Sequence, residues 1–452
     1  MANCKVRAIT TVFDNSHHRI QQLKGNHNHE VSSITTAAKR AGAEVASRAR
    51  ITTERVVDIV NTVRTTVPLI VQQTMPDVNS LKRRANRVRQ NENGFPSAPP
   101  NLEELVVPDN LKNISMRDPN GGENIEEPFV VHDSGPETGN RRFLIFSCAL
   151  LLQLLSTSAN WFLDATFKTV PNLAYQLLVV SAQFNNNRST IPCAYILLNS
   201  KDRNIYEDAF SALKNLVGDF SPETAMMDFE IGLHLAFLEV FPESHLSACF
   251  FHLCENIRRK IADVGLKVAV RDNHQLARSM AMFRALAFVP LEHVPTGFEL
   301  LKHHLTITYR DRPDFPLIEE VINYFETNYV GTRLRNGRRN QPLLARELWN
   351  VYEKTLESSP RTNNGMEGSH NKLHSFFDCD HPSFFKFIDL LRKHVKGLEA
   401  DIFDLRAGKN VSRPMSQAWA LLEHRKINLL ETFQPNDILG FLTEMAGLLA
   451  ST

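Results

Sequence analysis

The sequence contains little cysteine and no long hydrophobic run. Its 452 residues include only six cysteines, which are scattered along the chain rather than grouped in a framework, as expected for a protein of a reducing compartment. The N-terminus lacks the apolar core of a signal peptide, and the longest apolar run, residues 143–155, is too short to span a bilayer. These absences predict a soluble, intracellular protein without a membrane partner.

The sequence also lacks an excess of charge of either sign. Its net charge is only +1, and hydrophobic residues make up 42% of the chain, which is enough for a substantial core and for two or three domains. The charge is uneven, however, because the stretch from Lys39 to Arg89 holds eleven basic and four acidic residues. The small overall charge therefore hides a basic region.

The stretch from Trp161 to His252 carries the clearest structural signals. Short apolar runs bounded by polar turn residues predict five strands, and apolar residues at helical spacing predict two helices. The strands are expected at residues 161–167, 175–184, 189–198, 224–230 and 244–252, and the helices at 204–217 and 232–240. Pro192 favours an edge position for the third strand, and Gly218 is placed to end the first helix. This β-β-β-α-β-α-β order is that of a ribonuclease-H-like core, an α/β fold with a mixed five-stranded sheet.

Two of these strands carry an aspartate. Asp164 lies at the centre of the first apolar run, and Asp228 lies near the end of the fourth. A buried carboxylate is costly unless a cation or hydrogen bonds compensate its charge. Two such aspartates on neighbouring strands predict a divalent metal site, although capping of a strand or helix end would explain either residue alone.

Seven motifs follow one another in this region and beyond it: DATFKTVP (164–171), YQLL (175–178), IPCAYILL (191–198), DFE (228–230), FP (241–242), CFFHLCENIRRKI (249–261) and RTNNGMEGSHNKLH (361–374). In order and spacing they resemble the catalytic domain of Mutator-like (MULE) transposases. The resemblance covers roughly Arg142 to Leu390, so that the domain is expected at residues 141–390. One departure is Ala165, where the family usually has glycine, and this change leaves the carboxylate of Asp164 intact.

The resemblance implies an acidic triad of the DDE type, which by position is Asp164, Asp228 and Glu367. The triad would hold two divalent cations, Mg²⁺ or Mn²⁺, and two cations about 4 Å apart can stabilise the attacking and leaving oxygens of a phosphodiester together. Turn-forming residues before Glu367, among them Asn364, are placed to cap its helix. His370, one turn beyond Glu367, is expected to make hydrogen bonds around the metals.

Two groups of residues raise the question of zinc. Residues 1–31 resemble the second half of a FLYWCH-type zinc finger, with Cys4, His27 and His29 as ligands. A structural zinc needs four ligands, so the finger either takes one from elsewhere or is a truncated remnant without metal, and the ligand count favours the remnant. Cys249 and His252 form a Cys-x-x-His pair that also lacks ligands, and a buried cysteine with a histidine bonded near the active site explains it better.

Basic residues in two segments are candidate DNA contacts. Residues 32–90 predict three short helices in a helix-turn-helix-like region, the last of them basic and opened by Asn79 and Ser80. A Gly-containing loop lies in a long helical insertion at about 253–356, which also resembles the Mutator-like family. The candidates are Lys82, Arg83, Arg84, Arg87, Arg89, Arg333, Arg335, Arg338 and Arg339. A solvated surface or a nuclear-localisation patch gives a similar pattern.

The remaining segments predict no chemistry. Residues 91–140 are acidic and rich in asparagine, proline and glycine, which is typical of a flexible linker. Residues 391–452 have the pattern of an amphipathic helical tail.

The leading hypothesis is a nuclear DNA transposase of the Mutator-like class, which cleaves DNA strands in a metal-dependent reaction and transfers their 3′-hydroxyl groups. Its partners would be double-stranded DNA, as terminal repeats and as target, and further copies of the chain, since synapsis of two ends implies a homo-oligomer. The alternative is a domesticated, transposase-derived protein that binds DNA without cutting it, and the incomplete zinc finger favours this alternative. A third hypothesis, a ribonuclease or other nuclease, shares the triad but does not account for the long helical insertion. The residues alone leave the first two hypotheses open.

Overall fold

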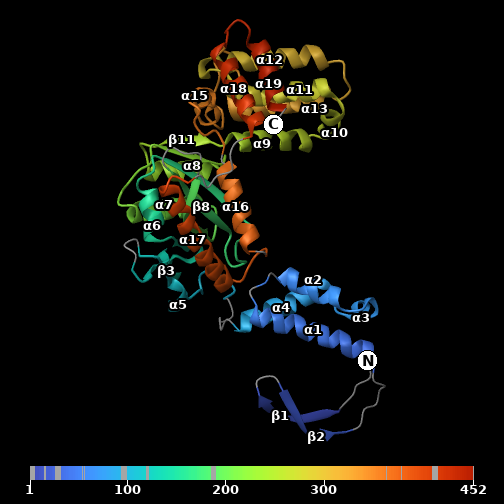
Figure 1. Cartoon of the computed structure of the whole chain (residues 1–452). Coiled ribbons are helices and arrows are strands. Elements are labelled where there is room, and N and C mark those ends of the chain that lie inside the picture. The colour runs from blue at the N-terminus through green and yellow to red at the C-terminus, as the bar shows by residue number, and fades with distance from the viewer. Residues whose placement is uncertain are drawn as a thin grey trace. The chain divides into compact units, whose positions relative to one another are not determined.

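The computed structural model describes residues 6–14, 17–25, 32–52, 54, 56–92, 99–118, 122–184, 190–362, 364–377, 379–409 and 416–450. The chain forms two compact units, Met1–Ser97 and Ala98–Thr452, and many of their elements are labelled in Figure 1. The candidate zinc ligands Cys4, His27 and His29 lie outside the described residues. In the described part of the chain, no helix combines the length and the apolar character needed to cross a bilayer.

The first unit contains a β-hairpin and a helical core. The hairpin pairs β1 (Arg7–Asp14) with β2 (His17–Lys24), and the helices are α1 (Ser33–Ile51), α2 (Val56–Thr66), α3 (Leu69–Thr74) and α4 (Val78–Glu92). Aliphatic side chains of these helices pack into a core of their own. Helices are therefore present at each of the three predicted segments, and the sequence does not predict the short α3.

Side-chain caps set the beginnings of two of these helices. The hydroxyl of Ser32 accepts a hydrogen bond from the Thr35 amide at 3.1 Å, as its position before α1 leads one to expect. In α4 the cap differs from the prediction, because the carboxylate of Asp77 accepts from the Ser80 amide at 2.9 Å. The helix consequently begins at Val78, ahead of the predicted Asn79-Ser80 opening.

Part of the predicted acidic linker is folded. Residues 99–118 and 122–140 include α5 (Asp109–Lys112), β3 (Asn113–Met116), β4 (Ile125–Pro128), β5 (Val130–Asp133) and a 3₁₀ helix (Pro136–Arg141). The buried guanidinium of Arg142 donates to the carbonyls of Leu102 and Leu105 at 2.9 and 2.8 Å and to the Asp133 carboxylate at 2.8 Å. The composition of this segment is typical of a linker. The segment is nevertheless folded in part, because the buried side chain of Arg142 donates hydrogen bonds to its backbone carbonyls.

The second unit is built around a mixed seven-stranded sheet. Its strands run in the order β11-β10-β7-β8-β9-β6-β5. Besides β5 they are β6 (Phe143–Phe146), β7 (Asn160–Thr166), β8 (Gln176–Gln183), β9 (Thr190–Leu198), β10 (Thr224–Met227) and β11 (His245–Ala248). All five predicted strands are present, and β5 and β6 extend the sheet beyond them. The last predicted strand is shorter than expected, because helix α9 begins at Phe250.

The edge position predicted for the third strand is wrong. That strand, β9, lies between β8 and β6. Its pairing with β6 runs from Leu198 only as far as Tyr195, so Pro192 lies beyond the paired segment on that side. On the other side Pro192 opposes Ser181 next to a register shift in β8. Proline is tolerated because no ladder hydrogen bond is required of it there.

Helices cover both faces of the sheet (Figure 1). One face, marked by Trp161, packs against α7 (Arg203–Leu216) and α8 (Ile231–Val240), and the Trp161 ring lies 5.4 Å from that of Phe241. The other face packs against α16 (Asn364–Phe377) and α17 (Phe384–Arg406), with Tyr195 6.2 Å from His394. Because Asp164 is an odd number of residues from Trp161, it belongs to the face under α16 and α17.

A second, helical core follows the sheet. It contains α9 (Phe250–Asp263), α10 (Lys267–Asp272), α11 (His274–Ala285), α12 (Val294–Tyr309), α13 (Phe315–Phe325), α14 (Arg346–Trp349) and α15 (Tyr352–Leu356), together with α18 (Gln417–Glu431) and α19 (Ile438–Ala450). The predicted tail at 391–452 is therefore not a separate element. Its first part continues α17, and α18 and α19 pack into the helical core.

Candidate catalytic site

The two predicted aspartates lie on neighbouring parallel strands. In the ladder between β10 and β7, Ala225 pairs with Trp161 and Met226 with Phe162. Asp228 directly follows β10, and continuing this register by two residues brings it level with Asp164, which lies two residues before the end of β7. The Asp164 side chain is 16% exposed and that of Asp228 is 50% exposed, so the pair lies at the margin of the covered sheet face.

Backbone and side-chain donors hold both aspartates. The amide of Ala165 donates to the Asp164 carboxylate at 3.0 Å, and the amide of Phe229 donates to that of Asp228 at 2.6 Å. His234, buried in α8, donates from Nε2 to the carbonyl of Asp228 at 2.6 Å. Burial lowers the pKa of His234 despite the nearby Asp228 charge, which keeps the imidazole neutral with its proton on the bonded nitrogen. The sequence gives no signal for this role of His234, because a histidine in an apolar helix resembles a core residue.

Two further histidines approach the carboxylates from helices. Nδ1 of His370 lies 3.4 Å from Asp164 Oδ2, and Nδ1 of His252 lies 3.6 Å from Asp228 Oδ1. Burial lowers the pKa of His370 to about 4. Burial also acts to lower the pKa of His252, but a hydrogen bond with Cys249 and the charges of Asp228 and Asp164 outweigh it and raise the value to about 9. The site thus places one neutral and one charged imidazole against its two aspartates.

The third predicted acid lies in the helix that packs on β7. Glu367 is in α16, three residues before His370. Since α16 packs against β7 and His370 reaches Asp164, the backbone of Glu367 is one turn from a residue that contacts the first aspartate. The side chains of Asn364 and Glu367 lie outside the described part.

The donor set suits a hard cation. Carboxylate oxygens are the ligands that Mg²⁺ and Mn²⁺ prefer, and the charges of Asp164 and Asp228 both act on His252. Among the described side chains, no group of three or more histidine, cysteine, aspartate and glutamate residues is arranged around one point that a metal ion could occupy.

The Cys-x-x-His pair has a different environment from that of a zinc site. Cys249 is the buried residue before α9, and His252 faces Asp228. His252 therefore lies against the carboxylate site.

The basic residues of α4 divide into two kinds. Arg83, Arg84 and Arg87 are exposed, and Lys82 is half-buried. Arg89 instead donates to the carbonyls of Ala49 and Thr52, both at 3.0 Å, and to that of Glu54 at 2.5 Å. Its guanidinium thus bonds the end of α1, and its first role is to hold the helices of this unit together.

The arginines at 333–339 divide in the same way. Arg333, Arg335 and Arg338 are exposed. The guanidinium of Arg339 pairs with Glu326 at 2.9 Å and with Glu299. Only the first three present their charge to solvent.

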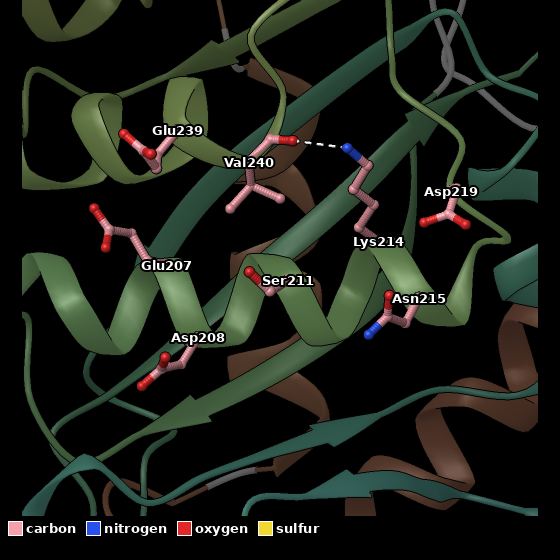
Figure 2. A pocket seen from close by; sticks show the side chains of 8 residues that line it. All are labelled: Glu207, Asp208, Ser211, Lys214, Asn215, Asp219, Glu239 and Val240. Carbon is pink, nitrogen blue, oxygen red and sulfur yellow. Dashed lines mark hydrogen bonds between the residues drawn. The ribbon is translucent and has the colours of Figure 1, made fainter.

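A groove elsewhere on the second unit is separate from this site. It has a volume of about 490 Å³ and lies between α7 and the end of α8, and Figure 2 shows Glu207, Asp219 and Glu239 among its lining residues. Lys214 crosses it and donates to the Val240 carbonyl at 2.9 Å. The groove is at the C-terminal end of α8, whereas Asp228 precedes the N-terminal end.

Carboxylates near the carboxyl ends of adjacent parallel strands are suited to binding divalent cations. A comparison with protein families adds an independent observation. Residues 160–256, which contain both aspartates, His234 and His252, match the family model of the MULE transposase domain. No curated protein matches the chain. The match supports a MULE-type transposase and, with it, a DNA partner.

Proposed function

We propose that this chain is a Mutator-like DNA transposase of the DDE type, with a ribonuclease-H-like catalytic core and a helical insertion between β11 and α16. The observation that supports the proposal is the parallel register of β7 and β10, which brings Asp164 and Asp228 level when it is continued by two residues. Both residues lie in the stretch that matches the MULE transposase domain. The reaction is cleavage of DNA strands followed by transfer of their 3′-hydroxyl groups.

The metal ligands in this proposal are Asp164, Asp228 and Glu367. Two bound divalent cations would activate the attacking water or hydroxyl and stabilise the leaving oxygen. The protein positions the ligands: His234 holds the backbone of Asp228, and the amides of Ala165 and Phe229 each hold one carboxylate. Carboxylates fixed in this way lose little freedom when a cation binds.

The DNA contacts we propose are cations of two segments, all of them exposed except Lys82, which is half-buried. They are Lys82, Arg83, Arg84 and Arg87 in α4 and Arg333, Arg335 and Arg338 beyond α13. Double-stranded DNA is the substrate, the nucleus is the compartment, and synapsis of two DNA ends requires at least two copies of the chain. Zinc in residues 1–31 is not needed for this chemistry.

The test is strand cleavage of a DNA fragment taken from the regions that flank the coding sequence, in Mg²⁺ or Mn²⁺. Asp164→Asn, Asp228→Asn and Glu367→Gln each keep the side-chain size and remove one charge, so each should abolish cleavage while binding to the fragment stays nearly unchanged. Because the three act as one metal site, a double variant should be little worse than a single one.

A matched control is Asp219→Asn. Asp219 is exposed and has a positive φ of 59°, a conformation that asparagine also adopts, and it lies outside the carboxylate site. This variant should cleave like the wild type. Cleavage retained by Glu367→Gln would overturn the triad, and DNA binding by a wild-type chain that never cleaves would support the domesticated alternative.

A further inference from the structure

Residues 331–340 form a closed β-hairpin in the helical part of the second unit. Arg333 and Arg339 face each other in an antiparallel bridge, and the Leu334 amide donates to the Arg338 carbonyl at 2.7 Å. At the tip, the amide of Gly337 donates to the Leu334 carbonyl at 3.0 Å, and Gly337 has a φ of 80°, which glycine adopts without strain. The segment is therefore a defined turn on two short arms.

The base of the hairpin is fixed by a partly buried charge cluster. Glu326, 8% exposed, pairs with Arg339 and Lys302, both at 2.9 Å. Burial acts to raise the pKa of Glu326, but hydrogen bonds from Lys302 and Arg339 outweigh it and lower the value. Gly331 adds a steric constraint, because a Cβ there would lie 2.0 Å from the Asn340 carbonyl oxygen. The arms are thus held in one orientation before any ligand binds.

The tip presents cations around an apolar side chain. Arg333, Leu334, Arg335 and Arg338 are exposed, and Leu334 keeps 45% of its surface in contact with solvent. Within the described residues, none of the three arginines forms a salt bridge, in contrast to Arg339. Leu334 thus lies in solvent between arginines that have no salt-bridge partner among the described residues, which leaves both the apolar and the charged side chains free to contact a partner.

We propose that this hairpin is a DNA wedge: its arginines enter the minor groove and Leu334 inserts between base pairs, which bends the duplex. The minor groove is roughly 6 Å wide and admits side chains from a turn. Its negative potential attracts arginine, and apolar side chains inserted at a base step are a recurrent way to kink DNA. The proposal rests on the proposed function for its choice of DNA. An acidic protein surface would also attract the arginines, but the same unit matches a transposase domain.

The experiment compares two exposed leucines in the full-length chain. Leu334→Ala removes the wedge, and Leu343→Ala, at a leucine 62% exposed outside the hairpin, removes a similar area elsewhere. A duplex of about 30 base pairs with a fluorophore at each end reports bending by energy transfer, without divalent cations so that no cleavage occurs. Leu334→Ala should reduce the change in transfer and weaken binding several-fold, and Leu343→Ala should match the wild type.

The arginines are tested by salt dependence. Arg333→Gln, Arg335→Gln and Arg338→Gln should each lower the slope of log K against log salt by up to about 0.9, the value for one neutralised phosphate. The arginine variants could lower the salt slope while Leu334→Ala bends the duplex as the wild type does. The hairpin would then contact only phosphates, and the wedge would be wrong. The wedge would also be wrong if the wild-type chain did not bend the duplex, or if the full-length chain bound polyglutamate but not DNA.

The two proposals fail separately in this design. Bending is measured without metal, so a chain that bends DNA but does not cleave it in Mg²⁺ or Mn²⁺ keeps the wedge and loses the transposase activity. Conversely, if the chain cleaves DNA and Leu334→Ala still bends the duplex normally, the transposase activity stands and the wedge is wrong. Thermal unfolding of each variant checks that the base at Glu326 and Arg339 is intact.

Discussion

His234 donates a hydrogen bond to the backbone carbonyl of Asp228 across 2.6 Å, and its side chain is buried in α8. The bond closes the turn between β10 and α8, in which the carboxylate of Asp228 also accepts from Phe229 at 2.6 Å. His234 therefore acts on the site through Asp228 and is a positioning residue rather than a metal ligand.

We expect His234→Ala to slow metal-dependent cleavage about 10- to 100-fold, the effect of losing a group that orients a metal ligand. His234→Gln, which can still donate to the carbonyl, should recover most of the rate. Titration of Mg²⁺ in the cleavage assay is the informative measurement, because a weakened metal affinity in the alanine variant would not follow from a purely structural role. Equal metal dependence in both variants would argue against positioning.

The main strands of the sheet were open to prediction because each is an apolar run bounded by turn residues. Asp164 and Asp228 stand out in the sequence for the same reason, since each is a lone charge in an apolar setting. The strand β6 was not predicted, because Phe143–Phe146 continues into the apolar helix α6 (Ala149–Leu155) with no turn signal strong enough to separate them. Long-range pairing decides such cases, and β6 becomes a strand by pairing with β9.

The parts of the site that the sequence did not reveal are the bonds between segments far apart in the chain. His370 reaches Asp164 only because α16 packs on β7, and His252 reaches Asp228 from the first turn of α9. The Cys-x-x-His spacing pointed to His252 but not to its partner. Hydrophobic periodicity in the sequence indicates which side chains are buried. It does not indicate which strand a helix packs against.

The arginines of α4 provide a paired prediction. Arg83→Gln, Arg84→Gln and Arg87→Gln should each lower the salt slope of DNA binding by up to about 0.9, with little effect on folding, because these side chains are exposed. Arg89→Gln should act differently, because its guanidinium bonds the carbonyls of Ala49, Thr52 and Glu54.

Hydrogen exchange in residues 33–92 of the full chain separates the two effects. Arg89→Gln should increase exchange in α1 and α4, since buried carbonyls lose their donor, and should leave the salt slope close to that of the wild type. If Arg89→Gln lowered the salt slope of DNA binding and left hydrogen exchange unchanged, Arg89 would be a DNA contact rather than a residue that holds the helices together.

A buried charge cluster joins the last helices to the chain segment before α16. Glu423 in α18 pairs with Arg361 and, at 3.0 Å, with Lys426, which is 4% exposed. The carbonyl of Arg361 in turn accepts from the Phe250 amide at 2.9 Å, at the start of α9.

Glu423→Gln should lower the free energy of unfolding by about 3 kcal/mol, because it leaves two buried cations without their partner. Urea denaturation measures the loss, and Glu431→Gln is the control, since Glu431 is exposed at the end of the same helix. If the two variants are equally stable, the cluster does not tie α18 to the fold.

His394 gives the fold a pH dependence that is separate from the carboxylate site. It is buried in α17, with Tyr195 6.2 Å and Phe376 5.8 Å away between ring centres. Burial lowers its pKa from 6.5 to about 4, with a smaller contribution from Lys372 in the same direction and an opposing one from Asp401. The folded protein therefore resists protonation of this ring, whereas the unfolded chain does not.

Because the pKa of His394 is lower in the folded state, the unfolded state binds more protons between pH 6.5 and pH 4, and stability falls as the pH falls through this window. Above pH 6.5 the contribution is complete and constant. The loss should be on the order of 3 kcal/mol by pH 4, at 1.36 kcal/mol for each unit of pKa. His394→Gln is neutral throughout, so its free energy of unfolding, measured in urea at each pH, should decline less steeply than that of the wild type. The difference between the two curves isolates His394 from the carboxylates that titrate in the same range. Parallel curves from pH 7 to pH 4 would show that the ring takes up its proton without unfolding.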